Sequence, residues 1–118
     1  MQLTVAELLE QNLLGVFGER DPIKRQAALE ILWSPQGVFI DPDGRFVGLD
    51  AINRRVEELQ AMFPNFVFTT RQPVSVMHEV GCLAWGFGLE GVSPAVTGVD
   101  VGVTGDGKLL ALYAFVDS

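Results

Sequence analysis

The chain has 118 residues, of which 48% are hydrophobic, and its 8 basic and 15 acidic side chains give a net charge of −7. This length predicts a single domain, residues 1–118, with one core, and the apolar content excludes a disordered chain. Nucleic-acid binders neutralise phosphates with a basic face, so a chain with this net negative charge is not expected to bind nucleic acid.

The sequence also predicts where the protein resides. No apolar run approaches the roughly 18–20 residues that a membrane helix needs. The N-terminus, MQLTVAELLE, lacks the basic segment and the apolar segment of a secretory signal. Cys82 is the single cysteine, which excludes an intrachain disulfide. We therefore expect a cytoplasmic protein that does not act at a membrane.

The first half of the chain has helical patterning. A capping box and a run of helically spaced apolar residues predict a helix over residues 4–17. An Asp-Pro pair begins a second helix over 21–33. A short strand at 37–40 leads into an Asp-Pro-Asp-Gly turn at 41–44. A third helix follows over 49–63 and ends before a proline.

The second half changes to the two-residue period of strands. Strands are predicted over 66–76, 82–89, 96–104 and 109–116, and Pro73 suggests an edge position or a bulge in the first of them. Helices followed by strands indicate an α+β fold, with helices on one face of an antiparallel sheet.

Two apparent motifs carry no chemistry. Gly86 to Gly91 matches G-x-G-x-x-G, but these glycines lie within a strand and no helix follows. We interpret them as positions where the strand bends or approaches other backbone. His78 and Glu79 begin like the zinc motif H-E-x-x-H, but the second histidine is missing. With one histidine and one cysteine in the chain, no zinc or iron site built from the protein is expected.

Two aspartates stand in apolar surroundings. In VTGVDVGV, alternation places Asp100 on one strand face with Val96, Gly98 and Gly102, and none of these is polar. A solvent-facing strand normally surrounds an aspartate with polar residues, so we predict that Asp100 points inward. Asp41 follows an apolar strand and begins a turn, so it is either a turn-capping residue or a functional one.

An inward carboxyl group without a neighbouring cation resists ionisation, because burial raises its pKa. Such a group donates a hydrogen bond or acts as a general acid or base near neutral pH. A second carboxyl group nearby separates the two pKa values and gives one acid and one base.

Four pieces of the sequence, in this order and spacing, resemble the nuclear transport factor 2-like superfamily and its SnoaL-like branch: FIDPDGRFVGLDAI, LAWGFG, TGVDVGV and DGKLLALYAFVD. The resemblance covers nearly the whole chain. It implies a cone-shaped, curved antiparallel sheet wrapped around three N-terminal helices, enclosing an apolar pocket. It also implies a homodimer formed through the outer sheet face. The superfamily includes enzymes that use no cofactor, such as ketosteroid isomerase and polyketide cyclases, so no cofactor is expected.

The resemblance assigns positions to both aspartates. Asp41 matches the aspartate that acts as base in ketosteroid isomerase, and Asp100 matches the protonated aspartate of its oxyanion hole, an arrangement established for that enzyme. The implied pocket walls are Leu83, Trp85, Phe87, Leu112, Ala114 and Val116, with Trp33, Phe39 and Val56 as further candidates.

One departure argues against ketosteroid isomerase activity itself. The oxyanion tyrosine of that enzyme lies on its first helix, where this chain has leucines, and the single tyrosine, Tyr113, should point to the outer face. Loss of one oxyanion donor typically costs about 10²–10³ in rate.

Three functions remain open. The first is a SnoaL-like domain that binds a small, apolar organic ligand, anchored by Asp100. The alternative is a cofactor-independent isomerase, cyclase or dehydratase with Asp41 and Asp100 as an acid/base pair. The third is an interaction domain whose dimer surface matters and whose pocket is vestigial.

Overall fold

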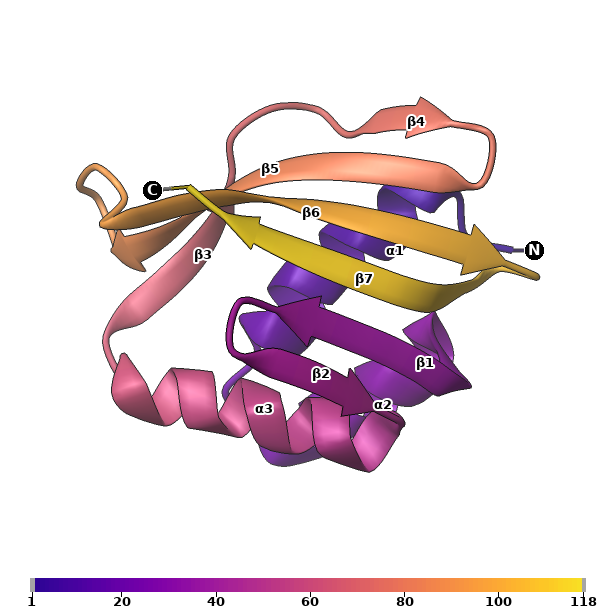
Figure 1. Ribbon diagram of the computed structural model, residues 1–118. Helices are drawn as coiled ribbons and strands as arrows, with labels where there is room; N and C mark the ends of the chain where they lie inside the picture. Colours follow the sequence, from indigo (N-terminus) through magenta and orange to yellow (C-terminus); the bar gives the residue numbers. More distant parts are fainter. Residues whose placement is uncertain (1, 118) are drawn as a thin grey trace.

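The computed structural model describes residues 2–117, which form one curved, seven-stranded sheet with three helices packed against it, the first of them continuing as a short π-helix (Figure 1). The elements in chain order are α1 (Val5–Asn12), η1 (Leu13–Phe17), α2 (Pro22–Leu32), β1 (Trp33–Asp41), β2 (Gly44–Val47), α3 (Leu49–Met62), β3 (Phe66–Thr70), β4 (Ser75–Met77), β5 (Val80–Leu89), β6 (Val96–Gly105) and β7 (Lys108–Val116). Among these described residues, none of the helices combines the length and apolar character of a membrane crossing.

The sheet has the strand order β2-β1-β7-β6-β5-β3, and β4 extends the edge beside β5. The predicted α+β class and the curved sheet are confirmed, but the sheet is not wholly antiparallel as predicted. One pairing is parallel, that of β1 with β7, and the others are antiparallel, so the sheet is mixed. Parallel strands require a long connection, and here most of the chain lies between the two partners.

The helix boundaries follow local hydrogen bonding. The Glu7 backbone N–H donates to Thr4 Oγ1 and the Thr4 backbone N–H donates to Glu7 Oε1, which completes the predicted capping box. Asp21 Oδ1 accepts from the Ile23 backbone N–H and begins α2. The first predicted helix is continuous, but its last five residues, 13–17, form the π-helix η1.

The strand boundaries differ in two places from the prediction. β1 begins at Trp33, four residues before the predicted strand at 37–40, and the added residues form an irregular part of β1. The predicted strand over 66–76 is divided into β3 and β4. Pro73 lies in the gap, because proline has no N–H to donate to a neighbouring strand.

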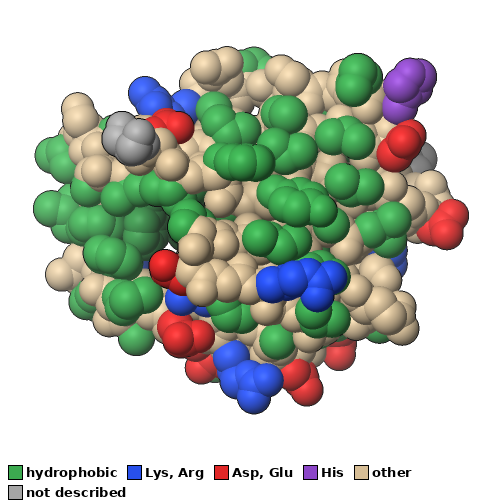
Figure 2. All heavy atoms as spheres, viewed as in Figure 1, with side chains coloured by type: hydrophobic (Ala, Val, Ile, Leu, Met, Phe, Trp, Pro, Cys, Tyr) green, Lys and Arg blue, Asp and Glu red, His purple; other side chains and the backbone are tan. Residues whose placement is uncertain are grey.

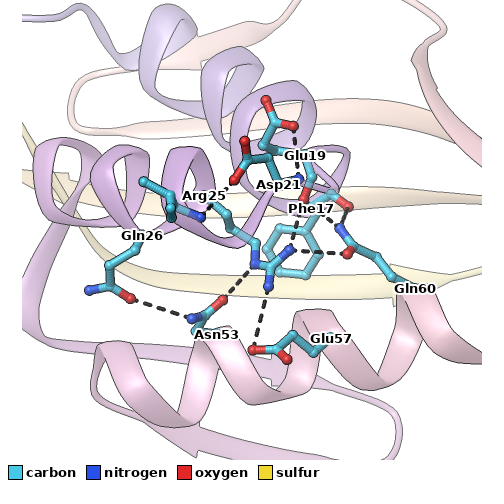
Figure 3. A network of polar contacts seen from close by, with 9 residues as sticks. Phe17, Glu19, Asp21, Arg25, Gln26, Asn53, Glu57 and Gln60 are labelled. Carbon is cyan, nitrogen blue, oxygen red and sulfur yellow. Dashed lines mark hydrogen bonds and ion pairs between the residues drawn. The ribbon is translucent and has the colours of Figure 1, made fainter.

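A buried arginine connects the helices (Figure 3). Arg25 of α2 is 2% exposed. Its Nε donates to Asn53 Oδ1 at 2.6 Å, and its Nη1 donates to Gln60 Oε1 at 3.1 Å, both on α3. Gln60 Nε2 in turn donates to the carbonyl oxygens of Phe17 and Glu19. These bonds hold the end of η1 against α3, which sets the position of the Phe17 ring.

Candidate functional site

A cavity of about 330 Å³ lies between the inner face of the sheet, η1 and α3. Figure 2 shows hydrophobic side chains gathered around a hollow on the left of the view, the side on which β3, α3 and the end of β7 meet in Figure 1. The cavity is lined by Leu13, Phe17, Phe39, Asp41, Pro42, Asp43, Arg55, Leu59, Phe63, Phe68, Trp85, Phe87, Val96, Asp100, Ala114 and Val116.

Aromatic rings form much of the wall. Phe68 of β3 and Phe87 of β5 stack with ring centroids 4.2 Å apart, and Phe63 of α3 meets Phe87 edge to face at 5.5 Å. Phe17 of η1 packs on Phe39 of β1 at 4.8 Å. Such rings supply apolar surface that excludes water from a ligand site.

Asp100 of β6 lies on this inner face and is 5% exposed. Trp85 Nε1 donates to Asp100 Oδ1 at 2.9 Å. Burial raises the pKa of Asp100 to about 7, and the hydrogen bond from Trp85 offsets only part of this effect. At neutral pH the carboxyl group is therefore divided between its protonated and ionised forms.

The second carboxyl oxygen of Asp100, a residue that lines the cavity, is Oδ2. No described residue donates to it, yet it is not sealed inside the protein. The one fully buried side-chain nitrogen or oxygen without a partner in residues 2–117 is Asn12 Nδ2. Asp100 Oδ2 is therefore open to a molecule in the cavity.

Gly98 makes the contact between Trp85 and Asp100 possible. Gly98 pairs with Trp85 across the β5–β6 ladder and shares a strand face with Asp100. A Cβ atom at Gly98 would overlap the Trp85 ring and the carbonyl oxygen of Phe115. Glycine at this position therefore leaves room for the indole to reach the carboxyl group.

Asp41 is both a turn cap and a cavity residue. Its Oδ1 accepts from the backbone N–H groups of Asp43 and Gly44 at 2.9 and 3.1 Å, which closes the turn between β1 and β2. Its Oδ2 accepts from Arg55 Nε at 2.7 Å. Both carboxylate oxygens are thus engaged, and a role for Asp41 as a base would require breaking the ion pair.

Among the described lining residues that the sequence did not predict, Arg55 is the one cation. In the sequence it belongs to a short charged run on the third helix, but its side chain is only 8% exposed. Burial disfavours its charge, but the hydrogen bond and charge of Asp41, with a smaller contribution from Asp43, raise the pKa of Arg55. The signal was present: position 55 lies three residues after Ile52 and four before Leu59, on the apolar helical face.

The two aspartates lie in one row across three strands. β1 and β7 pair Ile40 with Tyr113, and β6 and β7 pair Asp100 with Ala114. Asp41, the next residue of β1, therefore lies beside Ala114. Two strand spacings put the backbones of Asp41 and Asp100 about 10 Å apart. The small side chain of Ala114 leaves the space between them open.

The other predicted pocket residues divide into two groups. The cavity is lined by Phe39, Trp85, Phe87, Ala114 and Val116. Four do not line it and lie at most 1% exposed in the core: Trp33, Val56, Leu83 and Leu112.

Helix α1 explains why part of the predicted pocket wall lies in the core instead. It packs on β5 and β6 beyond the cavity. Leu9 of this helix fits against Gly81 and Gly102 and closes that end of the sheet, where Leu112 also lies. Trp33 is held in the core through a hydrogen bond from its Nε1 to Asn12 Oδ1 at 2.8 Å.

No protein-family model and no curated protein matches the sequence. Several solved structures, however, have a similar fold. A SnoaL-like family protein from Agrobacterium tumefaciens, provisionally named an isomerase, is 18% identical with a TM-score of 0.89, over 98% of this chain and 100% of that chain. A SnoaL-like protein from Jannaschia, provisionally named a polyketide cyclase, is 16% identical with a TM-score of 0.78, over 96% and 85%.

A protein with a ketosteroid isomerase-like fold from Catenulispora acidiphila, in complex with trimethylamine, is 14% identical with a TM-score of 0.74, over 95% of this chain and 86% of that chain. At these identities the likeness concerns the fold. The chain has the fold of the SnoaL-like and ketosteroid isomerase-like proteins, as its sequence pieces predict.

Proposed function

We propose that this chain, which has the SnoaL-like fold, binds a small, mostly apolar organic molecule in its cavity, and that Asp100 anchors a polar group of that molecule. The observation that carries the proposal is Asp100 itself. It is buried, one of its oxygens accepts from Trp85, and the other has no partner in residues 2–117. A few polar groups converging on an apolar cavity are typical of small-molecule sites.

The proposal predicts that a hydroxyl group on an apolar frame increases affinity through Asp100. The matched probes are tetralin and 5,6,7,8-tetrahydro-2-naphthol, titrated by NMR at pH 6, where Asp100 is mostly protonated. The wild type should bind both, and the hydroxyl should improve affinity about 3–10-fold, the value of one hydrogen bond. Asp100→Leu should remove this gain and keep tetralin binding.

Asp106→Asn is the matched control. Asp106 lies exposed in the β6–β7 turn at a positive φ that asparagine also adopts, so this variant should bind both probes as the wild type does. If neither probe binds the wild type, the ligand-binding function is wrong and the interaction-domain interpretation is favoured. If the hydroxyl gain survives Asp100→Leu, Asp100 is not the anchor.

A second candidate function is a cofactor-independent isomerase, cyclase or dehydratase in which Asp100 moves a proton beside a carbonyl group. It is favoured by the Asp100 pKa of about 7, because a general acid or base works best when its pKa is near the working pH. In this form of the proposal Asp41 does not act as the base. It holds Arg55 through an ion pair of 2.7 Å.

This activity predicts exchange of the protons next to the carbonyl of 1-tetralone with deuterium from the solvent. The exchange rate should rise with pH through an apparent pKa near 7, as Asp100 becomes ionised and able to accept a proton. Proton NMR of the C2 position measures the rate. Asp100→Asn should reduce it to the rate in buffer, while Asp106→Asn should leave it unchanged. An unchanged rate in Asp100→Asn would exclude the activity.

The homodimer stays a prediction. Its expected interface, the outer sheet face, carries exposed apolar side chains including Tyr113 and Phe115, which are 41% and 60% exposed. Figure 2 shows hydrophobic side chains spread over the part of the sheet that faces the viewer. The cytoplasmic location also stays a prediction.

A further inference from the structure

Arg55 is the single cationic side chain among the described residues that line the cavity. Its Nε donates to Asp41 Oδ2 at 2.7 Å and its Nη2 donates to Asp43 Oδ2 at 3.0 Å. Its third nitrogen, Nη1, has two N–H groups and no hydrogen-bond partner in residues 2–117. The two aspartates thus engage Nε and Nη2, and within that range the N–H groups of Nη1 stay unpaired.

Nη1 is not sealed inside the protein. Arg55 is a buried residue, and in the described part of the chain the one fully buried side-chain polar atom without a partner is Asn12 Nδ2. Nη1 therefore retains contact with open space, and Arg55 contributes to the cavity wall. A donor in a mostly aromatic cavity is costly to leave unpaired when a ligand displaces the water around it.

The guanidinium is also held in one orientation. Asp41 and Asp43 hold two of its nitrogens, and its Cζ atom lies 5.3 Å from the centre of the Phe46 ring. A donor fixed before binding loses little conformational entropy when it contacts a ligand. This arrangement favours recognition of one oxygen in one position.

The charge of the surroundings indicates which kind of oxygen fits. Arg55 already faces two aspartates, so the ionised cluster has a net charge of −1 and a carboxylate ligand would add a third anion. A carbonyl or enol oxygen accepts from Nη1 without that repulsion. On the other side of Ala114, Asp100 offers its free Oδ2 to a second polar group.

We propose that Arg55 Nη1 donates to a carbonyl oxygen of the ligand, and that the ligands of this protein are compact apolar molecules with two oxygen functions, a carbonyl at Arg55 and a hydroxyl at Asp100, placed across Ala114. This inference rests on the proposed function. It adds a binding residue and narrows the ligand class from apolar molecules to oxygenated carbonyl compounds.

Four probes of nearly equal shape test the inference: tetralin, 1-tetralone, 5,6,7,8-tetrahydro-2-naphthol and 6-hydroxy-1-tetralone. In the wild type the carbonyl should raise affinity about 10-fold in each pair, the effect of a hydrogen bond to a charged donor. The gains from carbonyl and hydroxyl should multiply, so 6-hydroxy-1-tetralone should bind most tightly. Arg55→Lys should lose most of the carbonyl gain and keep the hydroxyl gain.

A direct measurement uses the wild-type protein with ¹⁵N-labelled arginine, so that it does not depend on how well a variant folds. The Arg55 guanidinium signals are assigned by their loss in Arg55→Lys and their retention in Arg54→Lys, whose side chain is exposed. 1-Tetralone should shift the Arg55 Nη signals, and tetralin should leave them nearly unchanged.

The outcomes separate the two proposals. If no probe binds, the proposed function itself fails. If tetralin and the tetrahydronaphthol bind but the carbonyl adds no affinity and does not shift the Arg55 signals, the ligand-binding function stands and the role of Arg55 is wrong. If the carbonyl gain survives Arg55→Lys and disappears in Asp100→Leu, the carbonyl binds at Asp100 and the inference is overturned.

Discussion

Replacing Asp100 with asparagine is expected to make the protein more stable at pH 8, by roughly 2–4 kcal/mol in the free energy of unfolding. Asparagine keeps an oxygen that accepts from Trp85 Nε1, the bond that measures 2.9 Å in the wild type. It removes the ionisable group, and with it the free energy needed to hold a charge inside the protein.

The sign follows from the two pKa values of the carboxyl group. Burial raises the folded-state pKa of Asp100 to about 7, from an ordinary value of 3.8. Below pH 3.8 both states are protonated and ionisation has no cost. As the pH rises towards 7 the unfolded chain loses this proton first, so the contribution of Asp100 to stability falls by up to about 4 kcal/mol and then levels off.

Urea unfolding of the wild type and Asp100→Asn between pH 4 and pH 8 measures this effect. The two proteins should have similar stability at pH 4 and diverge as the pH rises, whereas Asp106→Asn should show no such divergence. A constant difference across the range would mean that Asp100 ionises at its ordinary pKa. It would also remove the main support for Asp100 as a proton donor at neutral pH.

Arg55→Met is expected to destabilise the protein by about 3 kcal/mol, because it leaves the Asp41 carboxylate buried without its cation. The Asp41 side chain is 7% exposed, so water replaces the lost partner poorly. For a domain of this size the melting temperature should fall by roughly 10–15 °C. Thermal unfolding followed by circular dichroism measures the change.

A double-mutant cycle separates the ion pair from simple packing. Asp41→Asn keeps the turn contacts of Oδ1 and removes the charge, so Arg55→Met should cost much less in the Asp41→Asn background. We expect a coupling energy of about 2 kcal/mol. Arg54→Met on the exposed face of the same helix should change the melting temperature little. Equal effects of Arg54→Met and Arg55→Met would show that Asp41 does not depend on Arg55.

The two aspartates show how far the sequence predicted the site. The inward orientation of Asp100 followed from its own strand, because alternation and two neighbouring glycines leave no polar face there. The role of Gly98 was only partly visible: the sequence places a glycine on the same strand face as Asp100, but the Trp85 ring that lies against it comes from the neighbouring strand.

Asp41 could not be understood in the same way. Its turn chemistry is local and was predicted, but its ion partner Arg55 is 14 residues away on a helix. A charged run on a helix normally faces solvent. The structure shows instead that Arg54 is exposed and Arg55 buried, because Arg55 lies on the apolar face of α3 that packs against β1 and β2. The helical spacing indicates this face, but it does not indicate that Asp41 is the partner.

The sequence by itself determined the helices, most of the strands, the α+β class and the buried Asp100, because periodicity, capping and turn residues act within a few positions of the chain. Only the tertiary structure decided the parallel pairing of β1 with β7, the ion pair of Asp41 with Arg55, and the boundary between cavity and core. These features join segments far apart in the sequence. The packing of α1 and α3 against the curved sheet selects them, and no local pattern encodes that packing.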